Sequence, residues 1–148
     1  SDAGLVALAP SPGGFDVAFA KFADCDSGEF CVSWLRVDDD GVASQADVES
    51  PDGMYWPALA VDEDGSPLIA YHAFNDDNWG DVFLVRGAPT GGDFGDPLNL
   101  TPGTDDTDET FPSQVHIEDD GRVSVVFEAV LADSDPLDGE VLIATVEF

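Results

Sequence analysis

The sequence predicts an all-β fold built from three repeats of short antiparallel strands. Residues 58–71 (ALAVDEDGSPLIAY) return as residues 114–127 (QVHIEDDGRVSVVF), and a diverged copy covers residues 7–19 (ALAPSPGGFDVAF). Short runs rich in β-branched and aromatic residues dominate the chain, and no window shows an amphipathic helical period. Repeats of about 40–55 residues made of short strands are typical of β-propeller blades, so this spacing predicts that architecture.

Each repeat predicts one blade of four antiparallel strands within a single domain. The second repeat is the clearest, with strands expected at residues 57–61, 67–74, 81–86 and 97–101. The Asp64-Gly65 and Asp120-Gly121 pairs, each between alternating apolar runs, are strong hairpin signals. The turn glycines Gly14, Gly65 and Gly121 mark the three repeats. The expected blade boundaries are residues 1–50, 51–103 and 104–148.

The first and third blades follow the same pattern less closely. In the first, residues 16–22 and 30–37 predict the two middle strands, and residues 48–50 predict the fourth. The third reaches only its third strand at Phe148. Three blades do not close a ring, because propellers typically have four to eight. We therefore expect either a homodimer that closes a six-bladed ring or further blades in a longer chain. A β-sandwich of about eleven strands is the alternative fold.

The charge is extreme, with 32 acidic residues against 4 basic ones and a formal net charge of −28. Nucleic acid is excluded as a partner because phosphate binding needs clustered Lys and Arg, and anionic lipid surfaces are excluded for the same reason. The apolar runs are too short for membrane insertion. The acidic excess indicates adaptation to a salt-rich environment, with calcium ligands among the carboxylates as the other explanation.

Cys25 and Cys31 are the only cysteines, and a five-residue spacer separates them between two expected strands. A hairpin would bring them within disulfide reach. The alternative is a pair of free thiols in a reducing compartment. The disulfide predicts an exported protein, whether secreted, periplasmic or on the cell surface.

The pattern P-x-L-x-V-D-x-D-G-x-x-x-I-A-Y at residues 57–71 recurs more loosely at residues 112–127. It resembles the repeats of exported bacterial propellers of the sialidase-like (BNR-like) group. The resemblance implies a propeller fold. The S-x-D-x-G-x-T-W box of sialidases is absent. The three arginines are not expected to form the carboxylate-binding triad of sialidases, because Arg36 and Arg86 occupy equivalent strand positions and Arg122 lies in a turn.

Acidic loops on one face of the expected propeller are candidate calcium sites. Calcium takes six to eight oxygen ligands, which closely spaced carboxylates on a loop can supply. Solvated acidic loops in an acid-rich protein are the alternative. The candidate ligands form two groups, Asp76, Asp77 and Asp81 in one loop and Asp105, Asp106, Asp108 and Glu109 in another.

Four aromatic residues, Tyr55, Trp56, Trp79 and Phe111, fall at or near the same face. Aromatic rings beside carboxylates and amides suit a sugar, because the rings stack on its CH face while the polar groups accept hydrogen bonds from its hydroxyl groups. The alternative for Tyr55 and Phe111 is packing between blades.

The sequence offers little evidence for catalysis. His72 and His116 are the only histidines and lie on different strand types. There is no G-x-S-x-G elbow, and neither cysteine has a plausible base partner. We therefore expect a non-catalytic exported binding or assembly module, self-associating, with a carbohydrate or a protein as its ligand. The alternatives are a fragment of a sialidase-like or glycoside-hydrolase-like enzyme whose catalytic blades are absent, and a purely structural repeat.

Overall fold

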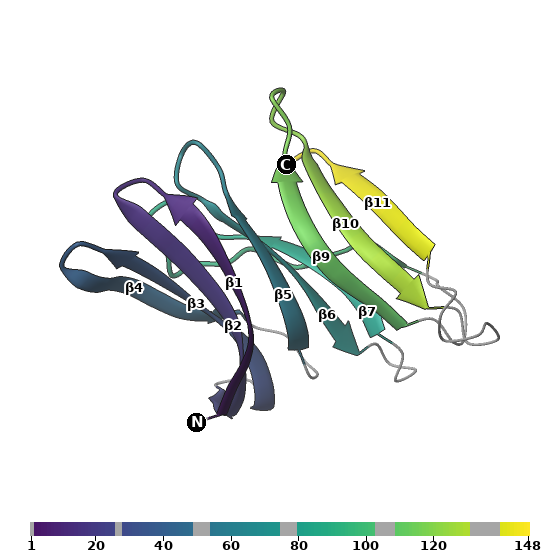
Figure 1. Ribbon diagram of the computed structural model, residues 1–148, viewed down its shortest axis with the longest axis horizontal. Coiled ribbons are helices and arrows are strands. Elements are labelled where there is room, and N and C mark those ends of the chain that lie inside the picture. Colours follow the sequence, from purple (N-terminus) through teal and green to yellow (C-terminus); the bar gives the residue numbers. More distant parts are fainter. Residues whose placement is uncertain (1, 26–27, 49–53, 75–79, 103–108, 131–139) are drawn as a thin grey trace.

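The computed structural model describes residues 2–25, 28–48, 54–74, 80–102, 109–130 and 140–148. These residues form three antiparallel sheets and contain no helix, so the all-β prediction is confirmed (Figure 1). None of their segments is a helix long and apolar enough to cross a membrane. Each sheet falls inside one of the three repeats.

The strands of each sheet pair in sequence order. The first sheet contains β1 (Asp2–Ser11), β2 (Gly14–Cys25), β3 (Gly28–Asp38) and β4 (Gly41–Val48). The second contains β5 (Met54–Val61), β6 (Pro67–Phe74), β7 (Gly80–Arg86) and β8 (Leu98–Asn99). The third contains β9 (Glu109–Ile117), β10 (Val123–Val130) and β11 (Glu140–Val146).

The three sheets pack face against face in the order of the chain. Figure 1 shows the second sheet between the other two, with β1 near β5 and β5 near β9. One hydrophobic layer, which includes Trp34 and Tyr71, lies between the first and second sheets. A second layer, which includes Leu84 and Phe127, lies between the second and third. Both faces of the second sheet are therefore covered, and β7 is almost continuously buried instead of alternating.

The described part of the third sheet has three strands, as expected for a repeat that reaches only its third strand. Two predictions of fourth strands were wrong. The fourth strand of the first sheet was predicted at residues 48–50 but begins at Gly41 and ends at Val48. It begins early because a tight turn at residues 39–40 reverses the chain directly after β3. In that turn the backbone N–H of Asp40 donates to Oδ1 of Asp38 at 2.8 Å. The fourth strand of the second sheet is shortened to two residues.

The turn glycine of the first repeat is Gly13 and not Gly14. Gly13, Gly65 and Gly121 all have positive φ, at 82°, 86° and 85°, which a residue with a Cβ rarely adopts. Gly14 instead lies in β2, where a Cβ would come within 2.0 Å of the carbonyl oxygen of Val37. The first turn is a two-residue Pro12-Gly13 connection, whereas residues 62–66 and 118–122 separate the strands in the other two repeats.

A buried charged group ties the first sheet to the second. Asp16 is fully buried and accepts hydrogen bonds from Trp34 Nε1 at 2.9 Å and from Arg36 Nε and Nη2 at 2.8 Å. The same guanidinium donates across the interface to the carbonyl oxygens of Gly65 and Pro89, both at 2.6 Å. Its hydrogen bonds with Asp16 raise the pKa of Arg36, so the group stays charged throughout the working pH range.

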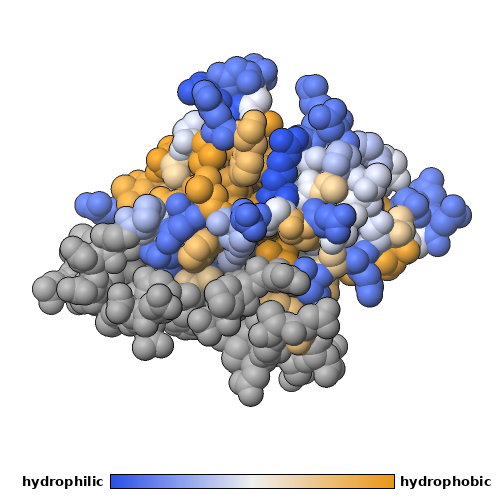
Figure 2. Space-filling view, turned by 180° about the vertical axis from the view of Figure 1, so that it is seen from behind, coloured by the Kyte–Doolittle hydropathy of each residue, from blue (hydrophilic) through white to orange (hydrophobic). Residues whose placement is uncertain are grey.

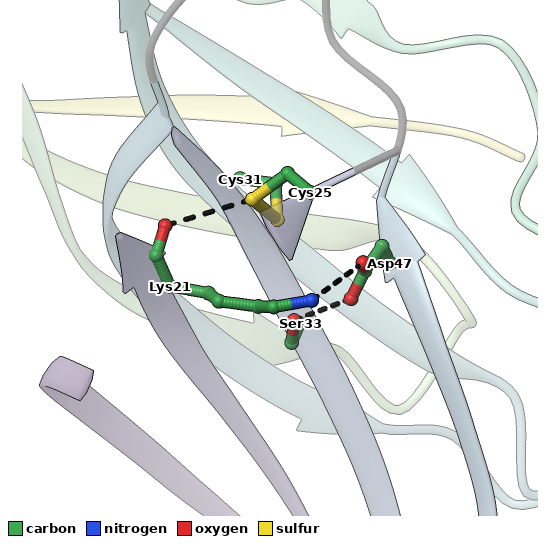
Figure 3. The surroundings of a disulfide bond; sticks show 5 residues. All are labelled: Lys21, Cys25, Cys31, Ser33 and Asp47. Carbon is green, nitrogen blue, oxygen red and sulfur yellow. Dashed lines mark hydrogen bonds and ion pairs between the residues drawn. A yellow bond between two sulfur atoms is a disulfide. The ribbon is translucent and has the colours of Figure 1, made fainter. Parts of the chain in front are cut away.

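The predicted disulfide between Cys25 and Cys31 is confirmed and links β2 to β3 (Figure 3). The two cysteines do not face each other in the strand register, since Cys25 lies opposite Gly28 and Cys31 opposite Lys21. An irregularity in β2 between residues 22 and 25 allows the bridge. Beside it, Lys21 Nζ lies 3.2 Å from Oδ2 of Asp47 on β4.

Removing the disulfide in the variant C25A/C31A is expected to lower the free energy of unfolding by about 2 kcal/mol. The bridge closes a loop of only about seven residues, and the entropy that so short a loop removes from the unfolded chain is modest. Urea denaturation measures the change, and the reduced wild-type protein should lose the same amount. A variant as stable as the oxidised wild type would contradict this expectation.

Candidate functional site

Two of the predicted ligand-binding residues, Trp56 and Phe111, lie together where the second and third sheets meet. The centroids of their rings are 4.8 Å apart in an edge-to-face arrangement. His72 of β6 completes the group: it stacks on Phe111 with centroids 5.0 Å apart and meets the edge of Trp56 at 6.0 Å. We call Trp56, His72 and Phe111 the aromatic cluster.

The aromatic cluster rests on buried hydrogen bonds. His72 is 3% exposed, and its Nδ1 lies 2.6 Å from the carbonyl oxygen of Thr110. A carbonyl oxygen only accepts, so Nδ1 carries the proton. The hydroxyl of Thr110 in turn donates to the carbonyl oxygen of Gly80 at 2.8 Å. A Cβ at Gly80 would overlap the His72 ring, so the ring can occupy this position only because residue 80 is a glycine. His72 is therefore a structural residue that fixes the orientation of its neighbours.

Trp56 departs from regular strand geometry. Its φ is +48°, a value that is a genuine outlier for a bulky residue. The pairing of β5 with β6 shifts register between Tyr55 and Ala58, so Trp56 lies in a bulge. It remains 42% exposed although Phe111 and His72 support it. The bulge thus exposes part of the Trp56 ring to solvent, while Phe111 and His72 contact the rest of it.

The remaining predicted site residues are described only in part or not at all. Phe111 is half-buried, in line with a packing role as well as contact with Trp56. Tyr55 and Glu109 occupy positions in β5 and β9, and only their backbones are described. The others lie outside the described residues: Asp76, Asp77, Trp79, Asp105, Asp106 and Asp108.

Asp81 is the candidate calcium ligand whose surroundings are described. Its side chain is 3% exposed. Oδ2 accepts from Asn99 Nδ2 at 2.8 Å, and Oδ1 accepts from Thr101 Oγ1 at 3.0 Å. Thr101 Oγ1 also accepts from the backbone N–H of Val82. Asp81 therefore holds the end of the second sheet together. Among the described residues, no group of three or more His, Cys, Asp or Glu side chains could hold a metal.

A cleft of about 520 Å³ lies between the second and third sheets, at the end opposite the aromatic cluster. Figure 1 shows this end at the top, where the turns that join β5 to β6 and β9 to β10 project. Its walls are acidic and its base is apolar. It is lined by Val61, Asp62, Glu63, Asp64, Leu68, Arg86, Ile117, Glu118, Asp119, Gly121, Val123 and Phe148.

The cleft exists because Arg86 behaves differently from its equivalent Arg36. Arg36 pairs with a carboxylate in its own sheet and reaches across to the next, which fills the interface at this end. The five-residue turn of the second sheet instead offers Asp62, and Arg86 donates to that carboxylate. The two-residue turn of the first sheet has no acidic residue. Sequence equivalence alone concealed this difference, because both arginines follow the same strand pattern.

The charge of the cleft restricts its ligands. Arg86 is the one cation among its lining residues, and Asp62 already neutralises it. The other four carboxylates repel an anion, so the cleft suits only a cationic or neutral group.

No protein-family model matches the chain, and no curated protein matches it either.

Proposed function

We propose that the protein is an exported, non-catalytic binding and assembly module whose three sheets are successive blades of a β-propeller resembling the sialidase-like group. Its ligand is a carbohydrate held at the aromatic cluster. The observation that carries the ligand proposal is the part-exposed ring of Trp56, which contacts the rings of both Phe111 and His72.

The way the sheets stack supports blades over a β-sandwich. Ile69 and Tyr71 lie four and six residues after Gly65, and they pack against the first sheet. Val125 and Phe127 lie at the same distances after Gly121, and they pack against the second sheet. The second and third sheets thus use equivalent positions to cover the sheet before them. This serial stacking is what propeller blades do, whereas a sandwich has two sheets that face one another.

The chemistry of the aromatic cluster favours a sugar. An exposed indole face offers apolar contact to the CH groups of a pyranose ring, and its supports fix the orientation before binding, which reduces the entropic cost. The strong negative charge disfavours anionic glycans. We therefore propose a neutral or amino sugar as the class of ligand.

Export is supported by the disulfide, which forms and persists in oxidising compartments. The proposed location is outside the cytosol, whether secreted, periplasmic or on the cell surface.

Replacing Trp56 with alanine is expected to lower glycan affinity at least about tenfold, since about 1.4 kcal/mol of stacking is removed. A glycan array identifies the ligand, and titration calorimetry measures its affinity for both proteins. Phe148→Ala is the matched control, because Phe148 is an exposed aromatic residue at the opposite end of the sheets and should leave affinity unchanged. Absence of glycan binding by the wild type, or equal affinity of W56A, would overturn the proposal.

A further inference from the structure

The outer faces of the first and third sheets carry exposed apolar side chains, and no other sheet among the described residues packs on them. From the repeat equivalences at these faces we infer that a second copy of the chain covers both of them, head to tail, so that two chains form a closed dimer of six sheets. The inference rests on the proposed blade architecture and names its partner.

The outer face of the first sheet repeats the surface that the other sheets bury. Val17 and Phe19 lie four and six residues after Gly13, which makes them equivalent to Ile69 and Tyr71 of the second sheet. Val17 pairs with Leu8 on β1, as Ile69 pairs with Leu59 on β5. Leu59 packs in the layer against the preceding sheet, whereas its equivalent Leu8 is 65% exposed. Ile69 and Tyr71 are fully buried in that layer, whereas Val17 and Phe19 are only half-buried. The first sheet therefore has an apolar packing surface that no sheet of the described residues covers.

Further apolar residues extend this surface. Val6 pairs with Phe19, so both point to the same side of the sheet, away from the Trp34 side that contacts the second sheet. Phe15 shares that side, two residues before Val17. The exposed apolar side chains here are Val6, Leu8 and Phe15.

The outer face of the third sheet repeats the opposite surface. Val141 and Ile143 pair with Glu128 and Val126 on β10. Their equivalents in the second sheet are Val82 and Leu84, which pair with His72 and Ala70. Val82 and Leu84 are fully buried between the second and third sheets, whereas Val141 and Ile143 are 72% and 67% exposed. On the left of Figure 2, hydrophobic residues gather over β11.

The two outer faces therefore continue one established interface. The third sheet presents outward the positions that the second sheet presents to the third. The first sheet presents outward the positions that the third sheet presents to the second. A first sheet from a second copy can then pack on this third sheet as the third packs on the second. This contact leaves two faces uncovered, the first sheet of the first copy and the third sheet of the second copy. When these two faces pack in the same way, the dimer is closed and has two-fold symmetry.

Light scattering on the full chain in about 2 M NaCl, where charge repulsion is screened, tests the inference. The expected mass is twice the 15.6 kDa of one chain. Leu8→Glu on the first sheet and Ile143→Glu on the third should each give monomers, since every interface in the dimer uses both faces. Leu98→Glu on β8, an exposed apolar residue of the second sheet, is the control and should stay dimeric.

Mixing the two monomeric variants distinguishes a dimer in which first sheets pack on third sheets from one in which each outer face packs on the same face of the other copy. Each variant keeps one intact outer face, and the two intact faces are complementary, so an equimolar mixture should regain a species of two chains. A monomeric wild type, loss of the dimer in only one of the two variants, or no recovery on mixing would each overturn the inference. Circular dichroism checks that the variants fold.

Glycan binding by the L8E and I143E monomers separates this inference from the proposed ligand. Neither substitution lies in the aromatic cluster, so a monomer that binds glycan shows that self-association failed and ligand binding did not. A dimer that binds no glycan shows the reverse.

Discussion

Arg36→Met is expected to lower the free energy of unfolding by about 3–5 kcal/mol, because it leaves the buried carboxylate of Asp16 without its countercharge. Asp16 is fully buried, and three of its hydrogen bonds come from Arg36 and Trp34. Methionine keeps the apolar stem in place, so the loss measures mainly the charge and its hydrogen bonds. Urea denaturation in molar salt gives the value.

Arg86→Met is the matched control, because Arg86 is the equivalent residue of the second sheet. Its partner Asp62 lies in a turn at the rim of the cleft, and the Arg86 side chain is 37% exposed. Water can solvate the carboxylate once the arginine is gone, so the expected loss is about 1 kcal/mol or less. Equal losses in R36M and R86M would show that the buried group does not hold the first two sheets together.

The double variant D16N/R36M tests the physical cause. Asparagine removes the unpaired charge and still offers an oxygen to Trp34 Nε1. If the cost of R36M is that of a buried unpaired carboxylate, the double variant should regain a large part of the lost stability. No recovery would assign the loss to the contacts of Arg36 with Gly65 and Pro89 instead.

The local strand signals of this chain were reliable where a rigid turn fixed the ends. The predicted strand at residues 67–74 agrees with β6 residue for residue, because the Asp64-Gly65 turn sets its start. The fourth strands were poorly predicted. They lie at sheet edges, where few packing constraints act on the sequence: β4 alternates weakly and β8 shrinks to two residues. Edge strands therefore carry the weakest sequence signal.

The candidate site was predictable only in outline. Sequence position placed Trp56 and Phe111 at the same end of the sheets, and the structure brings them into contact. The contact between His72 and Trp56 and the positive φ of Trp56 both depend on the bulge in β5. The sequence of this bulge contains no motif that would have predicted the shift in strand register. The acidic cleft was missed because it depends on the partner that Arg86 selects, which is a tertiary property.

The protein is expected to gain roughly 10–20 °C in melting temperature between about 10 mM and 2 M NaCl, which corresponds to several kcal/mol for a domain of this size. The chain carries a net charge of −28, with 32 acidic residues against 4 basic ones, so most of its carboxylates cannot pair with Arg or Lys. Among the described residues, Asp16, Asp47, Asp62 and Asp120 form such ion pairs. The other carboxylates repel one another. Since the Debye length falls from about 30 Å to about 2 Å over this range, salt removes most of that repulsion.

Calorimetry in NaCl and KCl measures the effect, and sucrose at matched osmotic strength controls for the exclusion of cosolvents from the protein surface. A melting temperature that does not depend on salt would show that the acidic excess is not an adaptation to salt.

Comparing two divalent ions separates charge screening from binding at specific sites. Calcium and magnesium at millimolar concentration screen equally, so equal shifts mean screening alone. A larger shift with calcium at constant ionic strength requires oxygen ligands arranged for calcium. Because Asp81 is buried and both of its oxygens already accept hydrogen bonds from Asn99 and Thr101, we expect such a site to use the other predicted carboxylates, so that Asp81→Asn leaves the calcium increment unchanged.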